Sequence, residues 1–106
     1  MIFRFMRVMV LFDLPVDTAQ DRRNYARFRK FLVREGFIMM QESVYVKLGL
    51  NGSIVSAVKR HVHENAPPAG LVQLLVVTEK QFADIEYIVG HKTTDVVDST
   101  DRFVLL

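Results

Sequence analysis

The sequence predicts a single α+β domain in which two helices lie on one face of an antiparallel sheet. Four segments have the apolar pattern of strands, two have helical periodicity, and they follow the order strand, helix, strand, strand, helix, strand. A chain of 106 residues has room for one such core. We assign the core to residues 1–78 and a C-terminal extension to residues 79–106.

The first predicted strand runs from Met6 to Asp13, and both of its faces are largely apolar. This pattern is typical of a strand at the centre of a sheet. Pro15 cannot donate a ladder hydrogen bond and biases Leu14 towards an extended conformation. The strand should therefore end at Asp13.

The first helix is predicted over Ala19–Glu35. Thr18 and Asp21 form a capping-box pattern at its start, and Gly36 is a suitable residue just beyond its end. The core-facing stripe of this helix comprises Tyr25, Phe28, Phe31 and Leu32.

Two short strands and a second helix follow. The strands are predicted at Phe37–Met40 and Val44–Leu48, with no glycine in the turn between them. The second helix is predicted over Ser53–Asn65, with either Asn51 or Ser53 as its N-cap.

The last part of the chain contains three strand-like segments. Leu71–Thr78 is apolar on both faces except at Gln73, which predicts a second central strand, and a short helical or irregular connector follows over Thr78–Ala83. The strand-like segments Ile85–Val89 and Arg102–Leu106 lie in the extension, and we expect them to pair with a sheet edge, either in the same chain or in a partner.

The order of the elements is that of the ferredoxin-like βαββαβ fold. Its two helices cover one face of the sheet, so the other face would expose Met9, Leu11 and their neighbours. Dimerisation through that face is the simplest way to cover it, and a sheet edge of the partner is then one of the two edges with which the extra C-terminal strands can pair.

Charge is distributed unevenly along a chain whose net charge is only +2. Residues 1–60 have a balance of +6 and residues 61–106 a balance of −4. The basic half indicates a polyanionic partner, and the acidic half indicates either a basic protein partner or a restraint on non-specific binding.

Composition excludes several classes of function. The chain has no cysteine, no apolar run long enough to cross a membrane and no leader-like start, so we expect no membrane association and a cytoplasmic location. Glycine-rich nucleotide-binding loops and the serine-hydrolase motif are absent. The histidines do not have the spacing of metal ligands, because His61 and His63 point to different sides of one predicted helix and His91 is isolated.

Asp13 is the candidate metal ligand and catalytic residue. A carboxylate at the end of an otherwise apolar strand needs a partner if it is buried, and the alternative is an ordinary strand-end aspartate that caps a backbone N–H. One carboxylate per chain is too few for a hydrolytic centre. Two copies of Asp13 across a two-fold axis could hold Mg²⁺, which could activate water against a phosphodiester.

The candidate nucleic-acid surface is a row of basic residues on the first helix, Arg23, Arg27, Lys30 and Arg34, called the cationic row below. It spans about 16 Å at roughly 1.5 Å per residue and contains no acid, although many such rows are only solvated helix faces. The predicted contacts are these four residues and Arg22. Arg22 and Arg29 lie on the opposite flank, where they could equally pair with acids.

Four segments at these spacings resemble the CRISPR-associated protein two family, the smaller of the two universal CRISPR adaptation proteins. They are Val10-Leu11-Phe12-Asp13-Leu14-Pro15, the basic helix Arg22–Arg34, Glu35-Gly36-Phe37, and Gln41-x-Ser43-Val44-Tyr45. The longer tail from Thr78 onward is similar to members found beside a single-protein interference effector.

The resemblance implies a symmetric homodimer whose C-terminal strand packs on the other protomer's sheet. The dimer would lie between copies of the adaptation integrase, CRISPR-associated protein one, and would hold the incoming double-stranded DNA. Members are also described as Mg²⁺-dependent nucleases on RNA or DNA that use the strand-end aspartate, here Asp13. Many have tyrosine before that aspartate, where this chain has Phe12.

Three functions therefore compete. The favoured one is a scaffold that positions DNA for the integrase, and the second is a Mg²⁺-dependent endonuclease that depends on Asp13. The third is a toxin-like metal-dependent endoribonuclease of the same fold or a ferredoxin-like regulatory dimer that binds a small ligand.

Overall fold

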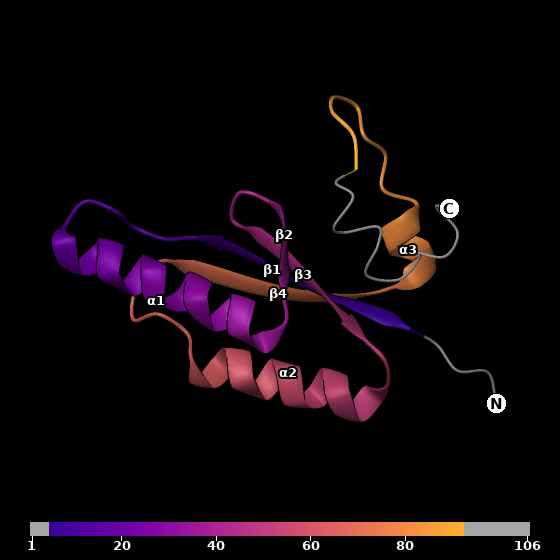
Figure 1. The fold of residues 1–106 in the computed structure, drawn as a ribbon, viewed down its shortest axis with the longest axis horizontal. Helices are drawn as coiled ribbons and strands as arrows, with labels where there is room; N and C mark the ends of the chain where they lie inside the picture. Colours follow the sequence, from indigo (N-terminus) through magenta and orange to yellow (C-terminus); the bar gives the residue numbers. More distant parts are fainter. Residues whose placement is uncertain (1–4, 93–106) are drawn as a thin grey trace.

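The computed structural model describes residues 5–92, and in that part of the chain four strands form one sheet accompanied by three helices. The elements are β1 (Met6–Asp13), α1 (Ala19–Glu35), β2 (Ile38–Gln41), β3 (Val44–Gly49), α2 (Gly52–Glu64), β4 (Leu71–Thr78) and α3 (Glu79–Ala83). Figure 1 shows α1 and α2 on one side of the sheet, with α3 beyond the end of β4 on the other side. This is the predicted α+β, ferredoxin-like arrangement.

The sheet has the strand order β2-β3-β1-β4, and neighbouring strands are antiparallel. β1 is central, as predicted. The prediction that β4 is also central is wrong, because β4 is an edge strand among the described residues. Apolar side chains on both faces of a strand indicate that both faces are covered. They do not indicate whether another strand is hydrogen-bonded along each of its two edges.

The two faces of the sheet have different environments. Val8, Val10 and Phe12 point towards α1 and α2 and form the core with Phe28, Leu32, Val58 and Val62. The opposite face, called the distal face below, carries Arg7, Met9, Leu11 and Asp13 of β1 and their register partners Val77, Leu75, Gln73 and Leu71 of β4. Met9 and Leu11 are half-buried, whereas Leu71 and Leu75 are 54% and 53% exposed.

The limits of α1 agree with the prediction at both ends. Thr18 Oγ1 accepts a hydrogen bond from the Asp21 N–H at 3.0 Å, and the Asp21 carboxylate accepts one from the Thr18 N–H at 3.2 Å. Gly36 ends the helix with φ of 103°, a left-handed conformation that favours glycine. Residues Phe28, Phe31 and Leu32 of the predicted stripe are buried, and Tyr25 is half-buried.

The β2–β3 hairpin differs from the prediction by one residue at three strand ends, namely the start and the end of β2 and the end of β3. Phe37 belongs to the helix end, because its N–H donates to the Leu32 carbonyl at 2.9 Å, so β2 begins at Ile38. Ser43 takes a left-handed φ of 63° in the turn, and the register shifts between Met39 and Gln41. A bulge and a non-glycine turn residue therefore replace the usual glycine turn.

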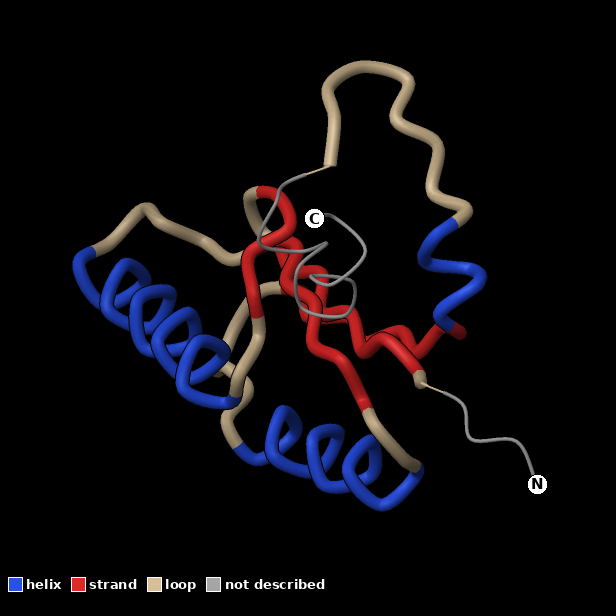
Figure 2. The backbone as a smooth tube through the Cα atoms, turned by 45° about the vertical axis from the view of Figure 1, so that its right-hand side comes forward, coloured by secondary structure: helices blue, strands red, loops and turns tan. Residues whose placement is uncertain are grey.

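α2 begins after Asn51, whose side chain accepts a hydrogen bond from the Ile54 N–H at 2.9 Å, so Asn51 is the N-cap. Figure 2 shows α2 running beside α1 under the strands. His61 Nδ1 of α2 lies 2.5 Å from the Glu35 carboxylate at the end of α1, which connects the two helices. None of the helices within residues 5–92 is long and apolar enough to span a membrane.

The extension begins with α3, which confirms the short helical connector predicted there. Residues 84–92 form neither helix nor strand, so the predicted strand at Ile85–Val89 is wrong for the single chain. Ile88 and Val89 are 85% and 90% exposed, and a strand without a neighbour has nothing to pair its backbone with. The predicted strand Arg102–Leu106 lies outside the described residues, and pairing with a partner chain stays a prediction.

Candidate nucleic-acid interface and strand-end carboxylate

Asp13 is the last residue of β1 and is exposed, in register with Leu71 of β4. Among the described residues its carboxylate has no ion-pair partner, and it caps no backbone N–H. In the single chain Asp13 is not buried, so the condition under which it needs a partner is not met, and the alternative role as a backbone cap is not found among the described residues. Water solvates the carboxylate, so its charge carries little desolvation penalty, and its oxygens remain accessible to a cation or a hydrogen-bond donor.

Two segments that are distant in sequence, the β2–β3 turn and the loop before β4, lie against the end of β1 at Asp13. The Phe12 N–H donates to the Ser43 carbonyl at 3.0 Å, which places the β2–β3 turn against the end of β1. Gly70, with φ of 96°, passes so close that a Cβ there would lie 2.8 Å from the Asp13 carbonyl oxygen. The backbone of Asp13 is thus held on both sides while its side chain stays accessible.

Phe12, the residue before the carboxylate, points to the opposite face of the sheet and is 7% exposed. Its ring centroid lies 5.9 Å from that of Tyr25, 5.3 Å from Phe28 and 5.8 Å from Tyr45. These are edge-to-face and stacked contacts of the kind that hold aromatic cores together. Phe12 is therefore a packing residue.

The cationic row occupies the exposed surface of α1, and all four of its residues are exposed. Arg23 donates to Gln20 Oε1 at 2.9 Å and Arg27 donates to Asn24 Oδ1 at 3.4 Å, so both guanidinium groups bond to neutral amides. No ion pair among the described residues involves this row. The row keeps its full positive charge towards solvent.

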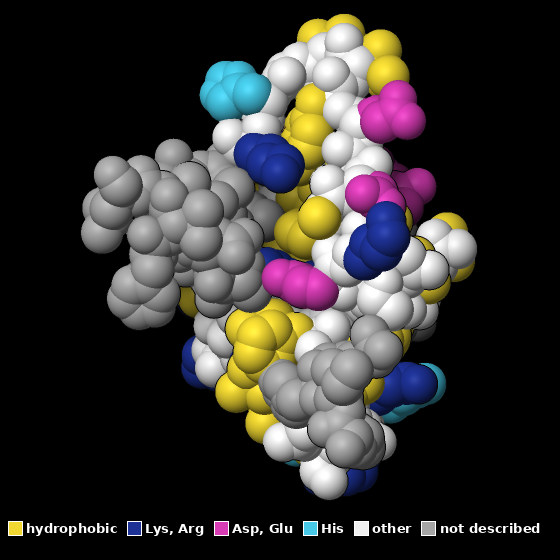
Figure 3. All heavy atoms as spheres, turned by 90° about the vertical axis from the view of Figure 1, so that its right-hand side faces the viewer, with side chains coloured by type: hydrophobic (Ala, Val, Ile, Leu, Met, Phe, Trp, Pro, Cys, Tyr) yellow, Lys and Arg dark blue, Asp and Glu magenta, His cyan; other side chains and the backbone are white. Residues whose placement is uncertain are grey.

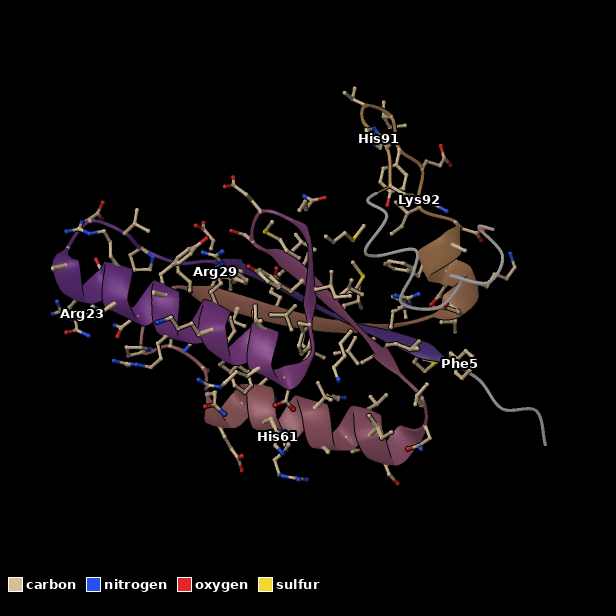
Figure 4. The ribbon with its side chains drawn as sticks, viewed as in Figure 1. Phe5, Arg23, Arg29, His61, His91 and Lys92 are labelled. Carbon is tan, nitrogen blue, oxygen red and sulfur yellow. The ribbon has the colours of Figure 1, made fainter. Side chains whose placement is uncertain are left out.

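Arg22 and Arg29 lie on the other flank of α1, and Figure 4 shows Arg29 and Arg23 on different sides of the helix. Arg22 donates to the carbonyls of Val16 and Asp17 at 3.1 and 3.4 Å, so it ties the start of α1 to the loop after β1. Arg29 pairs with no acid among the described residues. The acidic partners considered for both residues are therefore not found.

The structure does not bring Asp13 and the cationic row together. Asp13 belongs to the distal face, whereas the row faces solvent on the helix side of the sheet. A hydrolytic centre that uses both within one chain is not supported by this geometry. Two separate surfaces are available instead, one cationic and one with a single carboxylate.

Magnesium is the cofactor that the carboxylate suggests. An exposed Asp13 carboxylate fits the preference of Mg²⁺ for one or two carboxylate oxygens together with water. Within residues 5–92 no group of three or more His, Asp or Glu side chains could hold a metal ion. Among the described residues Asp13 is the candidate ligand that the sequence indicates, and a magnesium site shared by two copies of it stays a prediction.

A groove of about 440 Å³ lies between α2 and the edge strand β4. Its lining includes Val62, Val72, Leu74 and Val76 together with Lys59 and His63. An edge strand with an apolar groove beside it can accept an additional strand.

The sequence interpretation missed one buried ion pair, between Arg7 of β1 and Glu79 of α3. Arg7 Nε lies 2.6 Å from Glu79 Oε1, and Arg7 is 2% exposed. The available signal was a charged residue inside a strand that is otherwise apolar on both faces, because such a charge needs a partner.

Comparison with known proteins places these features in context. Residues 6–85 match the family model described as CRISPR associated protein Cas2. The chain is 48% identical over 101 residues to the "CRISPR-associated endoribonuclease Cas2" of Treponema denticola, covering 95% of this chain and all of that protein. It is 50% identical over 101 residues to the protein of the same name from Streptococcus mutans, covering 95% and 93% of the two chains.

A solved structure titled "Crystal structure of cas2" has a similar fold. Its TM-score with this chain is 0.57 at 20% sequence identity, and the match covers 85% of this chain and 92% of the other. At this identity the likeness concerns the fold alone.

Proposed function

This chain belongs to the CRISPR-associated protein Cas2 family, and from that membership we propose that two copies of it hold DNA for the adaptation integrase during spacer acquisition. The observation that carries the proposal is the cationic row. It is exposed and regularly spaced, and it forms no ion pair with an acid in the described part of the chain, which suits the phosphate backbone of a double-stranded DNA fragment.

Both the length of the cationic row and the exposed apolar side chains of the distal face favour a pair of chains. One row spans only about 16 Å, which is less than half of the roughly 34 Å of one duplex turn. The distal face has half-exposed Leu71 and Leu75, and contact between two such faces would remove them from water. Among residues 5–92 no strand pairs with the outer edge of β4, and this edge and its groove suit a C-terminal strand from the partner.

The arrangement favours a scaffold over an enzyme. Among the described residues the Asp13 carboxylate forms no ion pair with a lysine or histidine and belongs to no group of three or more His, Asp or Glu side chains that could hold a metal ion. Without a general base or a second metal ligand, Asp13 alone is a poor catalytic site, because each chain would offer a metal ion a single carboxylate. In this proposal CRISPR-associated protein one carries out strand transfer, and this chain supplies position and charge.

Reconstituted integration of a DNA fragment with the integrase tests the scaffold. The variant Arg23→Glu/Arg27→Glu should abolish integration, because reversed charges repel the phosphates, while Asp13→Asn should retain it. Lys80→Glu/Lys92→Glu changes the net charge equally on α3 and the following loop and serves as the matched control. Loss of integration in Asp13→Asn with retention in the arginine variant would refute the scaffold.

A second function is favoured by one observation, the exposed and unpartnered carboxylate of Asp13. Two such carboxylates across a two-fold axis would hold Mg²⁺, which when bound lowers the pKa of a coordinated water. The curated relatives are named endoribonucleases, so RNA is the first substrate to test, followed by DNA. Cleavage that requires Mg²⁺ and disappears in Asp13→Asn would support this activity, and cleavage that survives the substitution would point to a contaminating nuclease.

The sequence left a third possibility, a toxin-like endoribonuclease or a regulatory dimer that binds a small ligand. Both would act without the integrase. Co-purification of the chain with CRISPR-associated protein one separates them from the scaffold, because only the scaffold needs that complex.

A further inference from the structure

Arg7 is a buried cation on the distal face of the sheet. It is the second residue of β1 and is 2% exposed, in register with Val77 of β4 and Leu48 of β3. A buried guanidinium is costly unless charged or aromatic groups compensate for the lost water. The compensating groups therefore indicate what the residue does.

Two of these groups come from α3. Arg7 Nε lies 2.6 Å from Glu79 Oε1, and Arg7 Nη2 donates to Glu79 Oε2 at 3.1 Å, which makes a two-pronged contact. The guanidinium carbon also lies 4.5 Å from the centroid of the Phe82 ring. Glu79 and Phe82 are one helical turn apart, so Arg7 holds one side of α3. We call these three residues the Arg7 clamp.

α3 depends on this clamp for its position. The helix has five residues, far fewer than an isolated helix needs to be stable in water, and none of them is buried. Thr78 ends β4 and also caps α3, with its hydroxyl accepting from the Gln81 N–H at 3.0 Å, so no linker separates strand from helix. The cap sets where α3 starts, and the clamp sets the direction in which it lies across the sheet.

The clamp places α3 over one end of the distal face. Met6 pairs with Thr78 at that end, and Asp13 pairs with Leu71 at the other. Figure 3 shows the molecule from the α3 side, with hydrophobic side chains gathered among charged ones. A helix is about 10 Å thick and packed sheets lie about 10 Å apart, so a second sheet cannot pack over α3.

We propose that the Arg7 clamp is a positioning device that confines the contact with a second copy of this chain to the Asp13 end of the distal face. The inference rests on the pairing proposed above and deepens it. Leu71 and Leu75 remain available at that end, and a two-fold axis there brings the two copies of Asp13 towards each other. Neither Arg7 nor Glu79 touches substrate in this role.

Site-specific cross-linking tests the proposal, because the chain has no cysteine of its own. Gln73→Cys lies at the Asp13 end of the distal face, and Lys80→Cys, exposed on α3, is the matched control. Oxidation should link copies through position 73 and not through position 80. Hydrogen exchange of the α3 amides reports separately whether α3 is docked.

Glu79→Gln should speed exchange of the α3 amides by at least about tenfold, since the charge-assisted contact between α3 and the buried Arg7 is lost. The same variant should lower the cross-linking yield at position 73 relative to position 80. The double variant Arg7→Leu/Glu79→Leu removes both charges and retains apolar contacts, so it should restore slow exchange and linkage at position 73. The double variant also separates the clamp from a simple loss of folding.

Two results would overturn the inference. One is unchanged α3 exchange in Glu79→Gln, and the other is a released α3 with an unchanged cross-linking pattern. If Gln73→Cys with an intact clamp forms no cross-link and the wild-type chain sediments as a monomer, the pairing itself is refuted. In that case the exchange data still decide whether the clamp docks α3, so the two failures are distinguishable.

Discussion

Neutralising half of the cationic row is the most direct quantitative test of DNA binding. The variant Arg23→Gln/Arg27→Gln removes two exposed charges that bond to the neutral amides of Gln20 and Asn24. The side chains are exposed and form no ion pair among the described residues, so stability should change by no more than about 0.5 kcal/mol. A change in binding can therefore be attributed to lost charge.

The expected magnitude follows from counting cations. Four per chain in two chains give a slope of log K against log salt of about −7, at roughly −0.9 per neutralised phosphate. The variant removes four of these eight cations and should flatten the slope to about −3.6. Between about 50 and 200 mM salt, the affinity should then fall by roughly 10²-fold for the variant instead of roughly 10⁴-fold.

Fluorescence anisotropy of a labelled duplex, titrated at several salt concentrations, measures this slope. Lys80→Gln/Lys92→Gln is the control, with the same loss of charge on α3 and the loop after it. An unchanged slope in the α1 variant, or equal flattening in both variants, would show that overall charge attracts the DNA and that the row is not a contact surface.

Three further results are expected. Phe12→Ala should lower the stability by about 3–5 kcal/mol, because it empties the aromatic centre of the core, and thermal unfolding measures the loss. Gly70→Ala should also destabilise the chain, by about 1–3 kcal/mol, because the new Cβ meets the Asp13 carbonyl oxygen and Leu14 at 2.8 Å in a left-handed backbone; an unchanged melting temperature would contradict that close approach. Asp13→Asn should leave stability within about 0.5 kcal/mol of wild type, since the carboxylate is exposed and has no partner among the described residues, and denaturant unfolding would reveal any larger structural role.

Local chemistry in the sequence predicted most helix and strand limits. The ends of α1 depend on Thr18, Asp21 and Gly36, all within a few residues of the helix, and the structure confirms them. Asp13 was likewise placed correctly at the end of β1, because Pro15 prevents continuation of the strand.

Features that depend on distant contacts were not predictable in this way. The Arg7–Glu79 pair joins residues 72 positions apart, so no spacing rule reveals it. The edge position of β4 was missed because its side-chain pattern contains no information about neighbouring strands. The close approach of Gly70 to Asp13 is also visible only once β4 lies beside β1.

The last two residues of β1 lie next to each other in sequence but have unrelated surroundings. The shape and volume of the side chain matter at position 12, which is buried, whereas at position 13 the side chain is a carboxylate in water. Phe12 packs on the helix side of the sheet and Asp13 lies on the distal face, so the aromatic ring at position 12 contributes to the core and does not contact the surroundings of the Asp13 carboxylate.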